Sequence, residues 1–171
     1  MRTILIAGAV KVECRTVARR IASHFNSHGI ASACVDLADK DADKQLDIIS
    51  ENAPMYQLRI VCNDSHLDRA AMIERGKRPK PRFSNIDLAI IVDTDQLNFL
   101  NRAVNDKAYK TSQIALLDGY RRLKRSDVNA SFIRTVNTGD GNIGDLGDYG
   151  VLTASGKAVK FVNELLKGDL L

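Results

Sequence analysis

Cysteine is scarce in this chain of 171 residues, and the three cysteines form no paired motif. Cys14, Cys34 and Cys62 are an odd number, with no Cys-x-x-Cys and no Cys/His spacing. This pattern argues against a disulfide scaffold and against a zinc site, and it is typical of proteins in a reducing compartment. We therefore expect a cytoplasmic protein.

Long apolar runs are also missing. The longest runs, at residues 4–10 and 88–92, are far shorter than the roughly 20 residues that a membrane-spanning helix needs. The first run leads directly into charged residues without a credible cleavage site, so we interpret it as a buried strand and not as a signal peptide. The sequence predicts no association with a membrane.

The composition that remains is that of an ordinary globular protein. Hydrophobic residues make up 44% of the chain and charged residues 27%, and the length is enough for one sizeable core. We predict a single domain over residues 1–171. The net charge of +4 is compatible with a polyanionic ligand or nucleic acid.

Apolar runs alternate along the chain with segments of helical periodicity. This alternation predicts a three-layer α/β sandwich with a mostly parallel central sheet. Residues 112–119 fit a strand or a helix, and the glycine- and aspartate-rich residues 138–150 predict a long loop. The predicted strands are 3–10, 30–37, 56–64, 86–93 and 130–137, and the predicted helices are 16–28, one ending near Pro54, 65–76, 95–106 and 153–166.

The segment IAGAVKVECRT, residues 6–16, has the outline of a phosphate-binding loop between a strand and a helix. Such a loop needs glycines that let backbone N–H groups wrap an anion, a lysine at the terminal phosphates and a Ser/Thr hydroxyl on magnesium. Thr16 matches the hydroxyl, but Arg15 stands at the lysine and Cys14 at the second glycine. Two interpretations stay open: a degenerate phosphate loop (a degenerate Walker A motif) or a plain strand-to-helix turn.

Two other residues of this segment fit the first interpretation. Gly8 ends the apolar run, where a glycine lets a ligand approach the backbone. Lys11 lies within the segment and offers a second cation for phosphate. We therefore predict that Gly8, Lys11, Arg15 and Thr16 bind the cofactor.

Two later segments resemble the P-loop ATPases of the ParA and MinD type. In residues 85–104, NIDLAIIVDTDQLNFLNRAV, an apolar strand ends in Asp-Thr and a turn leads into a helix, which is similar to the second nucleotide motif of that family. The resemblance implies that Asp93 helps to hold magnesium through water. Residues 33–41, ACVDLADKD, look like the family's second strand, and this implies that Asp36 faces the attacking water.

The resemblance implies a P-loop NTPase-like fold and a nucleotide cofactor, ATP or GTP with Mg²⁺. Asp95 stands where the family usually has proline, and the family's loop with paired glycines and lysines is missing. We therefore expect a nucleotide-binding protein with weak or lost NTPase activity. It would act through a protein partner or as a homodimer.

Two other classes of protein remain as alternatives. Asp93 and Asp95, one residue apart after a strand, resemble the magnesium-binding carboxylates of Toprim-type enzymes, although Glu13 lies too far along to be their glutamate. The other alternative is a non-enzymatic scaffold, adaptor or nucleic-acid-binding protein that retains only the fold. It would use the basic loops 76–82 and 120–125 on phosphate backbones.

A reactive thiol is a further hypothesis from the same segment. Cys14 lies at the expected start of a helix and beside Arg15, and both features would favour its thiolate if the side chain were exposed. No partner base can be named from the sequence.

Overall fold

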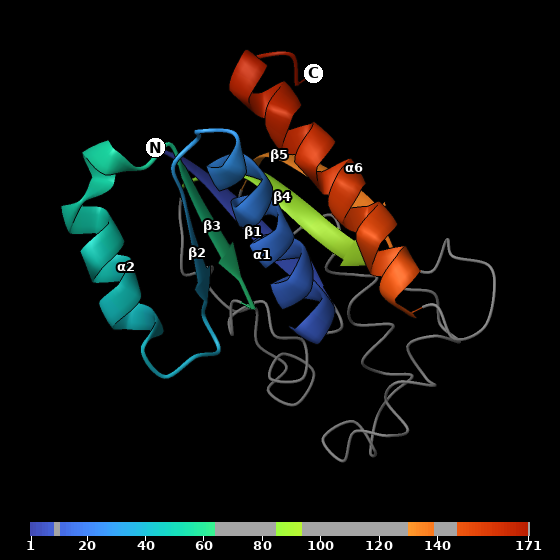
Figure 1. Ribbon diagram of the computed structural model, residues 1–171, viewed down its shortest axis with the longest axis horizontal. Helices are drawn as coiled ribbons and strands as arrows, with labels where there is room; N and C mark the ends of the chain where they lie inside the picture. Colours follow the sequence, from blue (N-terminus) through green and yellow to red (C-terminus); the bar gives the residue numbers. More distant parts are fainter. Residues whose placement is uncertain (9–10, 64–84, 94–129, 139–146, 171) are drawn as a thin grey trace.

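The computed structural model describes residues 1–8, 11–63, 85–93, 130–138 and 147–170 (Figure 1). Its centre is a five-stranded sheet in the order β2-β3-β1-β4-β5, in which every neighbouring pair is parallel. All five predicted strands are present, and the predictions for 86–93 and 130–137 match at both ends. The bounds are β1 Arg2–Gly8, β2 Ser32–Asp36, β3 Leu58–Cys62, β4 Ile86–Asp93 and β5 Ala130–Asn137.

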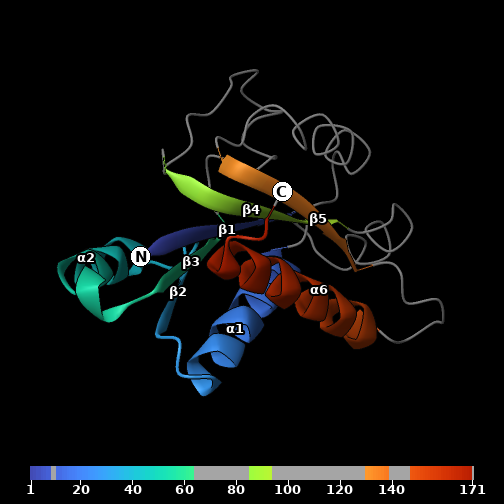
Figure 2. The same cartoon turned by 90° about the horizontal axis from the view of Figure 1, so that it is seen from above.

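Helices cover both faces of the sheet. The described helices are α1 Lys11–Ser27, α2 Ala42–Glu51, the short 3₁₀ helix η1 Ala53–Met55 and α6 Gly147–Lys167. Figure 2 shows α1 and α6 together beneath the sheet, and α2 packs against the opposite face. The predicted three-layer α/β fold is confirmed. None of the described helices combines the length and the apolar character that crossing a membrane requires.

The central strands β1 and β4 are nearly continuous apolar runs because both of their faces are buried. On β1, Ile4 and Ile6 belong to the core beneath α1 and α6, whereas Leu5 belongs to the core beneath α2. On β4, Leu88 and Ala89 divide in the same way. The strand order puts β1 at the centre of the sheet, and helix α1 follows shortly after its carboxyl end.

Two helix starts differ from the prediction. Helix α1 begins at Lys11 and not at Thr16, because its buried face extends into the first turn through Glu13 and Cys14. Helix α6 begins at Gly147, inside the predicted loop 138–150. The C-terminal glycine of α1 is where the sequence predicts it, since Gly29 has φ 79° and follows the last turn.

Several predictions fall on parts of the chain that the structure does not describe. These are the helices expected over 65–76 and 95–106, the ambiguous segment 112–119, the residue Asp95, and both basic loops at 76–82 and 120–125. They remain predictions.

Candidate functional site

The predicted site residues gather at the carboxyl edge of the sheet, around the end of β1. Gly8 lies opposite Val92 in the β1–β4 pair, so Asp93 follows at the same edge. Asp36 lies opposite Cys62 of β3. The first turn of α1 starts only a few residues after Gly8. The tertiary structure thus brings Gly8, Asp36, Asp93 and the start of α1 to one edge.

On one side of this edge, Arg15 of α1 is bound to the end of β2. The Arg15 Nε donates a hydrogen bond to the Asp36 carboxylate. The same carboxylate accepts hydrogen bonds from the Ala38 N–H and from the Asn63 side-chain amide, both at 3.0 Å. A second carboxylate, on Asp39, lies 3.6 Å from the Arg15 Nη2. Arg15 and Asp36, assigned separately from the sequence, therefore form one cluster.

The electrostatics of this cluster keep both partners charged. Burial by itself would raise the pKa of Asp36, but the hydrogen bonds from Asn63, Ala38 and Arg15, together with the Arg15 charge, outweigh burial and hold that pKa below its ordinary value. The same hydrogen bond, seen from the other partner, raises the pKa of Arg15 above its ordinary value. Asp36 is therefore an anion whose oxygens are already engaged by three donors.

On the other side of the edge, α1 is bound to the end of β5. The Thr138 hydroxyl lies 3.1 Å from Glu13 Oε2 and donates to it. It also lies 3.2 Å from the Asp93 backbone carbonyl, which accepts a bond from the Thr138 N–H at 2.8 Å. Glu13 is only 3% exposed. A buried carboxylate in the first turn complements the partial positive charge that a helix carries at its N-terminus.

Gly8 occupies a position where the packing leaves no room for a side chain. A Cβ there would lie 2.6 Å from the Val92 carbonyl oxygen and 2.7 Å from the Cys14 Sγ. Val92 belongs to the neighbouring strand and Cys14 to the first turns of α1. A glycine at residue 8 is thus required by strand and helix packing whether or not a ligand approaches it.

The remaining predicted residues lie on the same elements. Lys11 is the first residue of α1, and Thr16, half-buried, follows Arg15 in that helix. Asp93 is the half-buried last residue of β4. Within the described part of the chain, no three His, Cys, Asp or Glu side chains are grouped so that they could hold a metal ion. Mg²⁺ commonly binds one or two carboxylates plus substrate phosphates and water, so the single carboxylate of Asp93 is compatible with a metal that arrives with its ligand.

No protein-family model matches this chain, and no curated protein matches its sequence. The assignment of function therefore depends on the residues and their geometry.

Two functional candidates were not assigned a role from the sequence. Asn63 follows β3 with φ 57°, a left-handed conformation that asparagine tolerates, and it donates to Asp36. Glu13 could have been found from periodicity, because it lies four residues before Val17 and so shares the buried face of α1. Its partner Thr138 is 125 residues away in the sequence, so periodicity could not predict the contact between them.

The reactive-thiol hypothesis for Cys14 required an exposed side chain, and it is wrong because Cys14 is 0% exposed. Its neighbours in the sheet are also poor nucleophiles. Burial raises the pKa of the Cys34 thiol to about 11, although the Arg19 charge opposes this, and burial also raises the pKa of Cys62. The thiols are thus packing groups.

We expect the thiol of Cys34 to be alkylated slowly, although the side chain is only partly buried. With a pKa of about 11, only about one thiol in 1,000 is ionised at pH 8, so iodoacetamide should react roughly a hundredfold more slowly than with a free cysteine. Mass spectrometry of timed samples measures this rate, and the urea-unfolded chain is the control. A native rate equal to that of free cysteine would contradict the burial of this thiol.

Proposed function

We propose that this chain is a nucleotide-binding protein of the P-loop-like kind, with weak or lost hydrolysis, that acts through a protein partner or by dimerisation. The observation that carries the proposal is the position of the α1 N-terminus. This N-terminus lies at the carboxyl end of β1, the central strand. After β1 the chain forms β2 and β3 on one side of it, and then β4 and β5 on the other side. In open α/β sheets, ligands bind outside the carboxyl ends of the strands where the strand order reverses.

The charges at this position favour a phosphate group. Backbone N–H groups of a first helical turn are free of intrahelical partners and attract anions. Lys11 begins the helix, and the Arg15 side chain, 37% exposed, adds a guanidinium one turn later. We assign Lys11 and Arg15 to the phosphates, and Thr16 and Asp93 to Mg²⁺.

Three features support weak binding. Cys14 and Arg15 lie within α1, so they do not form a glycine-rich loop that wraps a phosphate. Glu13 places a buried carboxyl group in the same first turn, where it competes with an anionic ligand. Arg15 is shared with Asp36 and Asp39. We therefore expect a dissociation constant in the micromolar range or weaker for ATP or GTP.

The surroundings of Asp36 support weak or absent hydrolysis. A carboxylate that orients an attacking water must present an oxygen to that water. The Asp36 side chain is 4% exposed, and its oxygens already accept bonds from Arg15, Ala38 and Asn63. The catalytic assignment of Asp36 is thus the weakest part of the sequence-based prediction.

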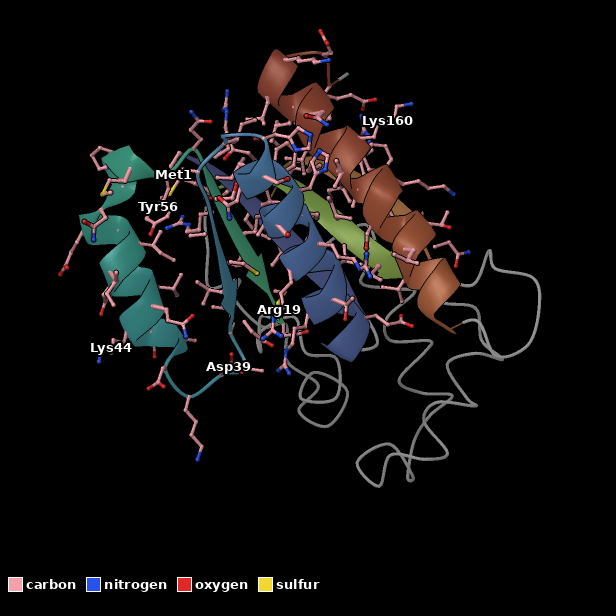
Figure 3. All side chains as sticks on the ribbon, in the orientation of Figure 1. Met1, Arg19, Asp39, Lys44, Tyr56 and Lys160 are labelled. Atoms are coloured by element: carbon pink, nitrogen blue, oxygen red, sulfur yellow. The ribbon has the colours of Figure 1, made fainter. Side chains whose placement is uncertain are left out.

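Calorimetric titration with ATP and GTP, with and without Mg²⁺, tests the proposed function. We expect Lys11→Gln to weaken binding about tenfold, because one charge-assisted contact to phosphate is lost. The matched control is Lys160→Gln, which removes the same charge from an exposed position on α6, at the opposite end of the molecule from Asp39 (Figure 3).

Lys160→Gln should bind like the wild type. Equal nucleotide affinity of Lys11→Gln and the wild type would show that Lys11 does not bind the phosphates. No binding by the wild type at millimolar nucleotide would overturn the proposed function, and nanomolar binding would show that the first turn of α1 wraps phosphate after all.

A further inference from the structure

The guanidinium of Arg15 is held by two carboxylates that differ in burial. The Asp36 side chain is 4% exposed, whereas the Asp39 side chain is 45% exposed. Asp39 lies in the turn between β2 and α2, and Figure 3 places it at the same end of the molecule as Arg19 of α1. Arg15 therefore has one inner carboxylate and one carboxylate on its solvent side.

Asp36 is the buried partner of Arg15. It bonds the Nε, and its own position is secured independently by the Ala38 N–H and the Asn63 amide. An ion pair whose inner partner is buried and has further hydrogen bonds is costly to break. Arg15 thus stays on Asp36, while its Nη2 faces the exposed Asp39 and its side chain is 37% exposed.

Asp39 is held much more weakly. Its oxygen is 3.6 Å from the Arg15 Nη2, which is an ion pair but is too long for a hydrogen bond. Exposed pairs of this kind contribute little to stability. A phosphate oxygen could approach the same nitrogen to the roughly 2.7–2.9 Å of a charge-assisted hydrogen bond and would bring more negative charge.

We propose that Asp39 occupies, on Arg15, the place of a ligand's phosphate oxygen, and that phosphate binding displaces it. This inference rests on the proposed function and names a competitor built into that site. Asp39 lowers the affinity for phosphate as long as it stays on Arg15. The turn around it contains backbone bonds from the Asp39 N–H to the Asp36 carbonyl and from the Ala42 N–H to the Asp39 carbonyl, so the displacement is a movement of the side chain and not of the strand.

Calorimetry with pyrophosphate and with ATP–Mg²⁺ on Asp39→Asn tests the inference. Removing the competing charge should tighten binding roughly two- to fivefold, the range expected for an exposed ion pair. The matched control is Asp41→Asn, two residues along the same turn. Asp41 is exposed, and its side chain makes no capping hydrogen bond to α2. Asp41→Asn should leave the affinity for pyrophosphate and for ATP–Mg²⁺ unchanged within error.

A double-mutant cycle makes the test specific to Arg15. In an Arg15→Lys background, whose ammonium lacks the guanidinium nitrogen that faces Asp39, the gain from Asp39→Asn should disappear. Circular dichroism and thermal unfolding establish that each variant is folded.

Three results would overturn the inference. Asp39→Asn and Asp41→Asn could change affinity equally, Asp39→Asn could bind more weakly than the wild type, or the gain could persist without Arg15. Each of these leaves nucleotide binding by the wild type intact. Absence of binding by the wild type and by Asp39→Asn alike would overturn the proposed function itself, so the two failures are distinguishable.

Discussion

Replacing Gly150 by alanine is expected to destabilise the protein by at least about 3 kcal/mol, at the upper end of the cost of overpacking a core. A Cβ at this position of α6 would overlap the Thr138 carbonyl oxygen and lie 2.9 Å from the carbonyl carbon. These are backbone atoms at the end of β5 and cannot rotate away. Either helix α6 would have to move off the sheet, or Thr138, which also donates to Glu13 of α1, would have to shift.

The measurement is chemical and thermal unfolding, in which a loss of this size lowers the melting temperature of a chain of this length by roughly 6–12 °C. The same helix provides a matched control. Gly156 is exposed, and a Cβ there would meet nothing within 4 Å. Gly156→Ala should stabilise the protein by about 0.5–1 kcal/mol, the difference in helix propensity. Equal effects of the two substitutions would contradict the close approach of α6 to β5.

Replacing Gly8 by alanine is the second change for which we expect a large effect, a loss of about 2–3 kcal/mol. The added methyl group would meet the Val92 carbonyl oxygen at 2.6 Å and the Cys14 Sγ at 2.7 Å. The first is backbone of β4, and the second is a fully buried side chain of α1. Either β1 and β4 separate slightly or the start of α1 moves outward.

A double-mutant cycle with Cys14→Ala separates these two contacts. Removing the sulfur makes room for the new methyl group, so Gly8→Ala should cost about 1 kcal/mol less in the Cys14→Ala background than in the wild type. Part of the cost should remain, because the Val92 carbonyl stays in place. Urea unfolding of the four proteins gives the coupling energy, and strict additivity would show that Gly8 and Cys14 do not share this space.

The packing role of Gly8 changes how the segment at residues 6–16 is interpreted. A glycine at the end of the first strand looks like part of a phosphate loop, yet here β4 and α1 already require it. The glycine alone therefore does not distinguish a nucleotide site from a plain strand-to-helix turn. The calorimetric experiments on Lys11 and Arg15 would make that distinction.

The sequence by itself determined the layers of the fold. Polar residues in the sequence bound both β4 and β5, so both strands could be predicted at their observed ends. The carboxyl-edge position of Asp36 and Asp93 followed from the same pattern, because parallel strands all end at one edge. Helix starts were harder to predict. The glycines of residues 138–150 indicate a loop, but Gly150 serves the close packing of a helix on Thr138.

Only the tertiary structure decided the partners of the first turn of α1. Arg15 pairs with Asp36 across 21 residues of sequence, and Glu13 bonds Thr138 across 125. The pattern of residues around Arg15 or Glu13 does not predict a partner so far away in the sequence. These contacts depend on the strand order, which puts β2 and β5 at the two outer edges of the sheet with β1 between them. Helix α1 packs beside that centre and so meets charged and polar side chains from both directions, which no periodicity in its own residues could specify.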